Sequence, residues 1–304
     1  MGKNKGTFLA LSAAVFWASI GLVARFLYGL GADPLFIVSA RSVLAALGMV
    51  FFGTFSYSRH YIKLKHILLG IVYGFVAIGA NFLLYFYAVR FTKVALAAAI
   101  IYVNPAFVML LSRIFLKEKQ PVKNWLSLIV ITIGVWLLAS APHSLRISQE
   151  LLGIGFALGC AFSIAVYNVA GKALLAYLSP WETLTLALMG GSILLVTISA
   201  GLGISWPRLP AAGWLGILFL ALCPTILGYG LYLKAVKLIG PTKSSLLATS
   251  EPVFAALLAW AVFHETLQLL QIVGVVLIIL GAIVLQIKSQ TSQKLDEIFR
   301  NFCK

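Results

Sequence analysis

The sequence has few charged residues and very few acidic ones. Charged residues make up 10% of the 304 positions, and 8 residues are Asp or Glu. A soluble domain carries about 25% charged residues, and no hydrophilic stretch here is long enough to form one. This shortage excludes a soluble globular protein. Together with a hydrophobic content of 62%, it predicts an integral membrane protein.

Cysteine clusters and nucleotide-binding patterns are also absent. Cys160, Cys223 and Cys303 are far apart in the sequence and form no CxxC or Cys/His cluster. This spacing disfavours disulfides and metal sites, so we interpret these cysteines as small apolar residues. The sequence also lacks a GxxxxGK[ST] phosphate-binding pattern, which excludes ATP-driven transport by this chain. We therefore expect neither a metal nor another cofactor.

The net charge of +15 is distributed over short loops beside apolar runs. A nucleic-acid-binding protein needs a continuous basic face, and this sequence offers none. In membrane proteins, loop cations instead fix the orientation of the chain. We therefore expect a lipid bilayer and a small-molecule solute as partners, and no nucleic acid. The sequence leaves the choice between a monomer and a homodimer open.

Ten apolar runs are long enough to cross a bilayer, which takes about 20 residues for about 30 Å of hydrocarbon. Pro, Gly or charged residues separate the runs, and Pro disfavours helix at the residue before it. The predicted spans are residues 6–30, 34–55, 67–89, 94–116, 122–140, 150–176, 180–202, 211–236, 241–263 and 267–287. The polar stretch from Pro142 to Glu150 divides them into two groups of five. The predicted fold class is an all-α integral membrane protein with ten transmembrane helices.

The two groups of spans repeat one pattern at an offset of 147 positions. The segment from Asn104 to Glu118 recurs from Glu251 to Glu265, with five of fifteen positions identical. Apolar composition alone does not fix such a register, so we interpret the chain as a tandem duplication. The predicted repeats cover residues 6–141 and 150–288, and residues 289–304 form a separate tail.

Loop cations predict that both termini are cytoplasmic. With the N-terminus inside, sixteen Lys and Arg residues lie in inside segments and four in outside loops, as the positive-inside rule requires. A five-span unit that begins inside ends outside, so its copy must be inverted. Inverted repeats are typical of alternating-access transporters, whose substrate site lies near the membrane midplane between the two halves.

The repeated segments resemble those of a known family. The second half contains SLLATSEPVFAALLAWAVFHETL and a last span with Gly274 and Gly281, and the first half contains ALAAAIIYVNPAFVMLLSRIFLKEK. Arg41 also follows Pro34 in the second span. Over nearly all of residues 6–288 the chain resembles the EamA-type permeases of the drug/metabolite transporter (DMT) superfamily. The resemblance implies two five-helix repeats in a bacterial inner-membrane carrier, often an exporter, of amino acids or other small metabolites.

The copies differ at Asn104, where the second copy has Glu251. Glu251 lies about ten residues into the ninth span, which is near mid-depth at about 1.5 Å per residue. A carboxylate there must pair, face a water-filled cavity or be protonated. Proton coupling during transport is one interpretation, and a hydrogen bond that supports helix packing is the other.

Both copies place a proline one residue later. Pro105 and Pro252 each remove a helix hydrogen bond and free a backbone carbonyl, at Ile101 and Ala248 respectively. In lipid such a break is tolerated where protein or a cavity satisfies the freed group. We therefore predict two helix breaks that shape the site, with a static kink as the alternative.

Polar and aromatic residues cluster at the depth of these breaks on six spans. Tyr and Trp give a cavity apolar walls with a hydrogen-bonding tip, whereas any single Tyr can also serve as a packing contact. The predicted cavity residues are Trp17, Ser19, Asn81, Tyr85, Tyr102, Asn104, Tyr167, Asn168, Tyr229, Tyr232, Thr249, Ser250 and Glu251.

Arg41 is a candidate contact for an anionic substrate group. Arg41 lies seven residues after Pro34, which begins the second span, so it is not far from the membrane interface. The alternatives are that it pairs with an acid inside the protein or that it snorkels to the interface. In the tail, Leu295, Ile298 and Phe299, with Phe302 one turn later, follow helical spacing and predict an amphipathic helix on the cytoplasmic leaflet. A helix that docks a partner protein is the alternative.

The function predicted from these features is transport, not catalysis. We expect a secondary active or facilitative carrier for amino-acid-like or other amphipathic metabolites, with efflux as the direction that the resemblance favours. A lipid or polyprenyl-phosphate flippase of the same architecture is the alternative, although it should show more cavity cations than Arg41. An intramembrane enzyme is disfavoured because it needs several acids or histidines at one depth, where the sequence offers Glu251.

Overall fold

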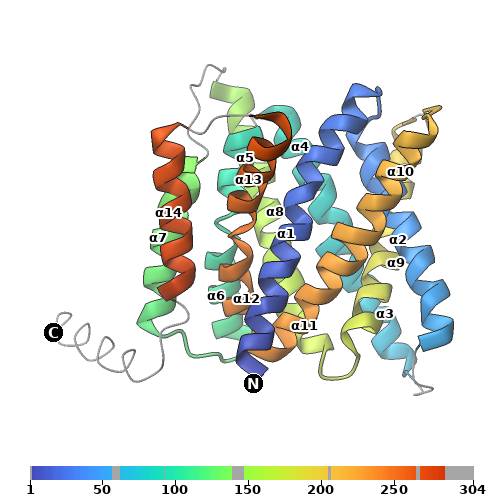
Figure 1. Cartoon of the computed structure of the whole chain (residues 1–304). Coiled ribbons are helices and arrows are strands. Elements are labelled where there is room, and N and C mark those ends of the chain that lie inside the picture. Colours follow the sequence, from blue (N-terminus) through green and yellow to red (C-terminus); the bar gives the residue numbers. More distant parts are fainter. Residues whose placement is uncertain are drawn as a thin grey trace.

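The computed structural model describes residues 2–56, 62–92, 94–138, 147–204, 207–264 and 268–284. All regular secondary structure within these residues is helical (Figure 1). Eight helical segments are long and apolar enough to span a membrane, and two shorter apolar helices cover residues 122–137 and 269–284. The prediction of an all-α membrane protein with ten spans is confirmed. The predicted tail and residues 142–146 of the predicted linker lie outside the described residues.

The first repeat contains five spans, of which the third and fourth are composite. In chain order they are α1 (Gly2–Gly29); α2 (Pro34–Ser56); α3 (Leu64–Gly74) with the π-helix η1 (Phe75–Ala80) and α4 (Asn81–Phe91); α5 (Val94–Ile101) with α6 (Asn104–Phe115); and α7 (Val122–Leu138).

The second repeat has the same order of elements. Its spans are α8 (Ile147–Leu174); α9 (Pro180–Gly201); α10 (Ala211–Leu220) with the π-helix η2 (Ala221–Gly228) and α11 (Tyr229–Ile239); α12 (Pro241–Ala248) with α13 (Glu251–Phe263); and α14 (Leu269–Val284). Because each repeat has five spans, α8 runs opposite to α1 and the repeats are inverted. Since α8 begins at Ile147, the last four residues of the predicted linker are helical.

Local turn chemistry sets several helix ends. Before α2, the Asp33 carboxylate accepts hydrogen bonds from the backbone N–H groups of Leu35, at 2.7 Å, and Phe36, at 3.3 Å. Before α9, Ser179 and Glu182 form a reciprocal capping box. These side chains satisfy N–H groups that a helix leaves without partners at its start, so they fix where α2 and α9 begin.

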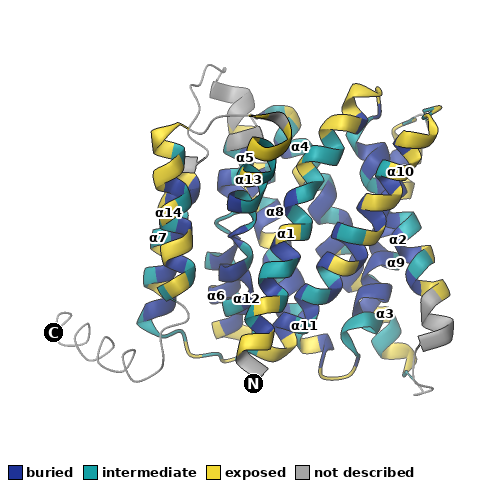
Figure 2. Ribbon diagram, viewed as in Figure 1, coloured by how far each residue is buried: buried dark blue, intermediate teal, exposed yellow. Residues whose placement is uncertain are grey.

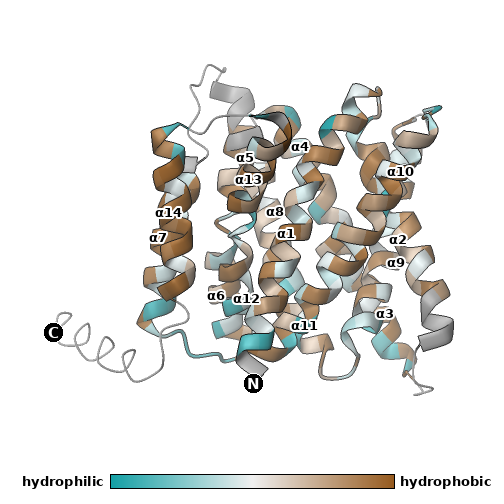
Figure 3. Cartoon of the chain, viewed as in Figure 1, coloured by the Kyte–Doolittle hydropathy of each residue, from teal (hydrophilic) through white to brown (hydrophobic). Residues whose placement is uncertain are grey.

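The outer surface of the bundle is apolar. Phe8 is 70% exposed and Leu269 is 77% exposed, and such residues recur along the outward faces of the helices. Buried positions concentrate along the centre of the bundle (Figure 2), and hydrophilic residues concentrate at its two ends (Figure 3). Since a soluble monomer rarely exposes so much contiguous apolar surface, lipid contacts these faces.

Small residues allow the spans to pack closely. A side chain at Gly74 would collide with the backbone of Ala187 in α9, and one at Gly190 would collide with the carbonyl of Ile71. The fifth spans of the two repeats, α7 and α14, pack side by side at one edge of the bundle (Figure 1). There the Ser127 hydroxyl donates to the Gly281 carbonyl at 2.7 Å. The other spans surround the interior in which the candidate site lies.

Candidate functional site

Turns interrupt the fourth and ninth spans at equivalent positions. α5 ends at Ile101 and α6 begins at Asn104, while α12 ends at Ala248 and α13 begins at Glu251. Pro105 and Pro252 each lie in the first turn of the second segment, where a missing N–H group disrupts no helix bond. Each of these spans is therefore a discontinuous helix.

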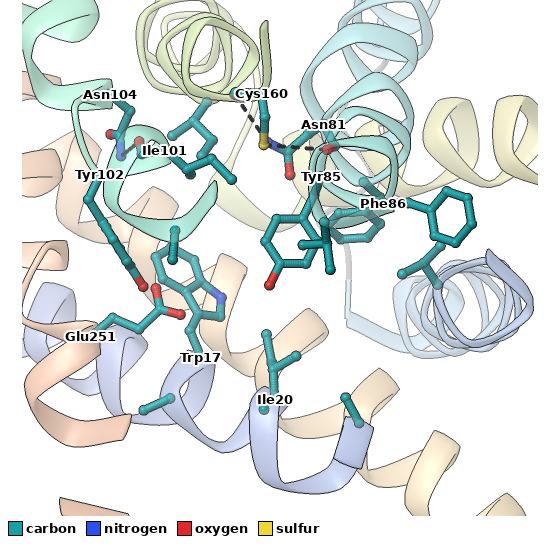
Figure 4. Close-up of a pocket in the computed structure, with 18 of the residues that line it drawn as sticks. Trp17, Ile20, Asn81, Tyr85, Phe86, Ile101, Tyr102, Asn104, Cys160 and Glu251 are labelled. Carbon is teal, nitrogen blue, oxygen red and sulfur yellow. Dashed lines mark hydrogen bonds between the residues drawn. The ribbon is translucent and has the colours of Figure 1, made fainter. Parts of the chain in front are cut away.

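The two breaks satisfy their polar groups differently. In the first repeat the Asn104 side-chain amide donates to the Ile101 carbonyl, at the end of α5, at 3.0 Å. In the second repeat the Glu251 carboxyl forms a hydrogen bond with the Tyr102 hydroxyl of the opposite break. Figure 4 shows these two side chains meeting at the cavity wall. One hydrogen bond therefore joins the broken helices of the two repeats.

A cavity of about 660 Å³ lies between the repeats. Both helix breaks border it, and its wall includes eleven of the thirteen residues predicted for it together with Arg41. The eleven are Trp17, Asn81, Tyr85, Tyr102, Asn104, Tyr167, Asn168, Tyr229, Tyr232, Thr249 and Glu251. The structure therefore brings residues from seven spans to one site.

Ser19 and Ser250 are not part of the cavity wall. The Ser19 hydroxyl donates to the Phe16 carbonyl at 2.6 Å, and the Ser250 hydroxyl donates to the Leu247 carbonyl at 2.8 Å. A serine can satisfy its hydroxyl within its own helix in this way. Depth along a helix therefore did not suffice to predict these two positions, because it does not specify which face a residue occupies.

Aromatic side chains close one side of the cavity. The Trp17 ring lies 5.0 Å from the rings of both Tyr229 and Tyr232, measured between centroids. Its Nε1 donates to the Pro224 carbonyl at 3.1 Å, and the Tyr232 hydroxyl donates to the Asn168 side chain at 2.6 Å. Because their polar tips are bound, the Trp17 and Tyr232 rings are held in place, and Tyr229 packs against Trp17 in the same apolar wall.

Two π-helical segments present residues to this cavity. η1 and η2 lie at equivalent positions of the third and eighth spans, and Asn81 and Tyr229 follow them directly. Such segments shift the register of a helix and are frequent at functional sites. Pro224 inside η2 is a sequence signal for the second segment, whereas the first has no comparable signal.

Arg41 is buried, with 4% of its surface exposed. Its guanidinium carbon lies 4.2 Å from the centroid of the Phe82 ring. Its Nε atom has no hydrogen-bond partner in the described part of the chain. Arg41 therefore does not snorkel to the interface, and instead forms part of the cavity wall.

The sequence interpretation missed several residues of the wall. These are chiefly Arg25, Tyr28, Phe82, Phe86, Arg90, Cys160 and Ser245. Phe82 could have been found, because it is the offset partner of Tyr229. Cys160 had no such signal, and its thiol lies 3.4 Å from the side-chain amide nitrogen of Asn81 (Figure 4).

The cavity extends toward one end of the bundle. Its wall includes Tyr28 near the end of α1, Pro34 at the start of α2 and Arg90 near the end of α4. These three helix ends lie together at the upper end of the bundle in Figure 1. On α1, the cavity wall begins at Trp17 within the described residues. The opposite end of the bundle is therefore the closed one.

Polar contacts between the repeats hold this closed end, and we call the contacts among Glu118, Gln120 and Thr242 the clasp. Gln120 donates to the Thr242 hydroxyl at 3.1 Å, and that hydroxyl donates to the Glu118 carboxylate at 3.4 Å. Burial raises the pKa of Glu118, while Thr242, Lys172 and Lys243 act in the opposite direction. The clasp joins the end of the fourth span to the start of the ninth.

Lys172 binds next to the clasp. Its ammonium group donates to the carbonyls of Val236, at 3.3 Å, and Lys237, at 2.9 Å. A cation at a helix C-terminus compensates the unpaired carbonyls there. Lys172 therefore binds the C-terminal end of α11.

Sequence comparison assigns the chain to a family. The profile of the EamA-like transporter family matches twice, at residues 4–140 and at residues 151–287. The chain belongs to the EamA-like transporter family. The predicted resemblance is confirmed, and the double match agrees with the two inverted repeats. This EamA-like protein is thus a multi-pass membrane transporter.

Relatives of this EamA-like transporter carry transporter names. The uncharacterized transporter YwfM of Bacillus subtilis is 28% identical over 288 residues, covering 94% of this chain and 95% of its own. The uncharacterized inner membrane transporter YicL of Salmonella typhimurium is 25% identical over 300 residues, covering 95% and 98%. One solved crystal structure aligns with a TM-score of 0.79 at 18% identity, covering 96% of this chain and 99% of that one. That last likeness shows the fold.

Proposed function

We propose that this transporter moves small amphipathic metabolites across the membrane by alternating access. The observation that carries the proposal is the cavity of about 660 Å³ between two inverted repeats, bordered by both helix breaks. Small-molecule sites are typically concave and largely apolar, with a few polar groups that fix orientation. Aromatic walls with Glu251 and Arg41 provide such a surface for a solute that has both an apolar body and polar ends.

Alternating access requires two closures that exclude each other. The structure has a cavity that extends toward one end and a clasp that closes the other. In inverted-repeat transporters, one half or bundle rocks against the other around a central site. Release of the clasp, together with closure of the helix ends at Tyr28, Pro34 and Arg90, would present the same cavity to the opposite side.

Loop cations and the relatives support a location and an orientation. The sixteen-to-four excess of Lys and Arg favours cytoplasmic termini, so the clasp would face the cytoplasm and the cavity would open outward. A relative named as an inner membrane transporter supports the bacterial inner membrane. We propose efflux as the direction, driven by protons that enter from outside.

Glu251 is the proposed proton carrier. It lies on the cavity wall and shares a hydrogen bond with Tyr102. An ionisable residue inside a membrane protein marks a proton or substrate path by default. When Glu251 is protonated it loses its charge and gains an O–H donor, so the charge-assisted bond from Tyr102 weakens. Loading and release of a proton would thus change a contact that links the repeats.

Reconstituted transport tests both parts of this proposal. Purified protein in liposomes should move a radiolabelled amino acid or related metabolite, faster when a pH gradient is imposed. Glu251→Gln should keep exchange of labelled for unlabelled solute while losing the response to the gradient. An unchanged pH response in Glu251→Gln would contradict proton coupling, and the absence of both transport and exchange would contradict the carrier.

The flippase alternative gains support from the structure. Arg25 and Arg90 contribute to the cavity wall in addition to Arg41, and additional cavity cations are what we expected of a flippase. Cavity arginines could bind a lipid phosphate as well as a soluble anion. Transport of a fluorescent anionic lipid between leaflets, measured in the same liposomes, separates the two functions.

A further inference from the structure

We propose that the substrate carries an anionic group that Arg41 binds, attached to a flat apolar body that lies along the aromatic wall. This inference rests on the proposed function and narrows its substrate to amphipathic anions. Such anions include soluble carboxylates and anionic lipid headgroups, which share this chemistry. Three observations support it independently.

The first observation is that the Arg41 charge is buried without full compensation. Its side chain is 4% exposed and its Nε has no hydrogen-bond partner in the described part of the protein. Burying an unpaired charge or donor costs free energy unless a partner satisfies it. The Phe82 ring, 4.2 Å from the guanidinium carbon, provides a cation–π contact and leaves the donor unsatisfied. Because Arg41 lines the cavity, an anionic substrate group there would compensate the guanidinium charge.

The second observation is the balance of charge along the cavity wall. Three arginines, Arg25, Arg41 and Arg90, contribute to the wall. Among the described residues that line it, one is acidic, Glu251. Arg25 and Arg90 are exposed near the end toward which the cavity extends. A solute that enters there passes a wall with more positive than negative side chains, and a cleft lined with one sign of charge concentrates ions of the opposite sign. A cationic solute would be disfavoured along this path.

The third observation is the placement of two tyrosines near both charges. Tyr85 and Tyr229 line the same cavity as Arg41 and Glu251, and each is close enough to both charges to interact with them electrostatically. Glu251 already has a partner in Tyr102. The anionic end of a solute would therefore lie at Arg41, and its body would extend past the tyrosines toward the helix breaks. Guanidinium groups bind carboxylate and phosphate well because they can donate two parallel hydrogen bonds.

Three probes that share one ring test this inference. Indole-3-propionate is an anion, tryptamine is a cation and tryptophan is a zwitterion, and all three have an indole body. Binding to the purified full-length protein in detergent should be tightest for indole-3-propionate or tryptophan and weakest for tryptamine. Preferential binding of tryptamine would overturn the inference and leave the carrier standing. Binding of none of the three would contradict both.

Variants assign the preference to Arg41. Arg41→Gln should weaken indole-3-propionate binding by at least about tenfold, as expected from loss of a hydrogen bond to a charged group. Arg41→Lys keeps a buried charge without the planar fork and should give an intermediate affinity. Arg113→Gln makes the same chemical change on an exposed residue of α6 outside the cavity wall, and should leave the affinity unchanged. Equal affinities for wild type and Arg41→Gln would overturn the inference.

A lipid competitor identifies the source of the anion. Short-chain phosphatidylglycerol is titrated against bound indole-3-propionate, with a phosphatidylcholine of equal chain length as control. If both lipids competed equally, and competed equally well in Arg41→Gln, the site would not recognise an anionic group and the inference would be overturned. Competition specific to phosphatidylglycerol assigns the site to a lipid headgroup, whereas no competition by either lipid assigns it to a soluble anion. Both of these last two results support the anionic class.

Discussion

The two repeats build the same broken helix and give it different chemistry. In both repeats, the third span contains a π-helical segment and the fourth span is broken. Proline is the second residue of the helix that follows the break. Asn104 completes its own break by donating to the Ile101 carbonyl. Glu251, at the equivalent position, instead bonds to Tyr102 across the repeat boundary. The broken helix is therefore a property of the fold, and the acid is an addition to one copy.

A second difference concerns the ends of the bundle. Arg25 and Arg90 of the first repeat contribute to the cavity wall. Their offset partners, Lys172 and Lys237, are at the closed end, where Lys172 binds the carbonyls that end α11. Thr242 of the clasp has Ala95 as its offset partner, which has no hydroxyl to donate. The two ends of the bundle are formed by equivalent segments of the repeats. The side chains of the clasp are what distinguishes the closed end.

Making the two breaks alike should have the largest effect. Glu251→Asn would let an amide donate to the Ala248 carbonyl, as Asn104 does to that of Ile101. Because the acid is gone, transport driven by a pH gradient should fall by roughly 5–150-fold, the range of a coupling free energy of about 1–3 kcal/mol. Proteoliposome uptake with and without the gradient measures the ratio.

The matched change in the first repeat should act on stability instead. Asn104→Ala removes the amide that satisfies the Ile101 carbonyl, so it should cost about 1–3 kcal/mol of folding free energy. Transport by the Asn104→Ala protein that does fold should still be accelerated by the pH gradient. If Asn104→Ala abolished the pH response as fully as Glu251→Asn, the two breaks would share the coupling role and our comparison would fail.

Weakening the clasp should have an intermediate effect. Thr242→Ala removes the hydrogen bonds to Gln120 and Glu118, and one such bond contributes about 1 kcal/mol, or roughly a fivefold change in an equilibrium constant. The cavity should therefore open more often toward the clasped end. Labelling of Ala98→Cys, on the cavity wall, by an impermeant maleimide applied from that side should be roughly fivefold faster.

A threonine elsewhere provides the control for this experiment. Thr197→Ala removes a hydroxyl that bonds to the Ile193 carbonyl of its own helix, so it should not alter labelling. Both measurements use a background in which the natural cysteines are alanine. Equal labelling rates for Thr242→Ala and Thr197→Ala would show that the clasp does not control access.

The pH dependence of the clasp should be the smallest effect. Burial raises the pKa of Glu118, so the clasped state binds a proton more tightly than a state in which Glu118 is solvated. Acidification through the raised pKa should therefore favour the clasp, and this contribution is lost as the pH rises above that pKa. The Ala98→Cys labelling rate should increase with pH in this window, after correction for the reagent's own pH dependence. Glu118→Gln should flatten that profile, and a decrease with rising pH would contradict the assignment.

Much of this architecture could be predicted because it depends on local chemistry. Apolar length identified the ten spans, and Pro105 and Pro252 marked where two of them break. Depth along the helices led to most of the cavity residues. It did not lead to Arg25 and Arg90, which the sequence places near loops. Their contribution to the wall depends on how α1 and α4 pack against α2.

The sequence by itself determined the spans, their duplication and their inversion, because bilayer thickness and loop charge impose rules that act along the chain. Only the tertiary structure decided what Glu251 bonds to, which face Ser19 occupies and which end is closed. Hydrogen bonds such as that between Tyr102 and Glu251 join residues far apart in the chain. Their geometry is fixed by the packing of the two repeats, and no local pattern encodes it.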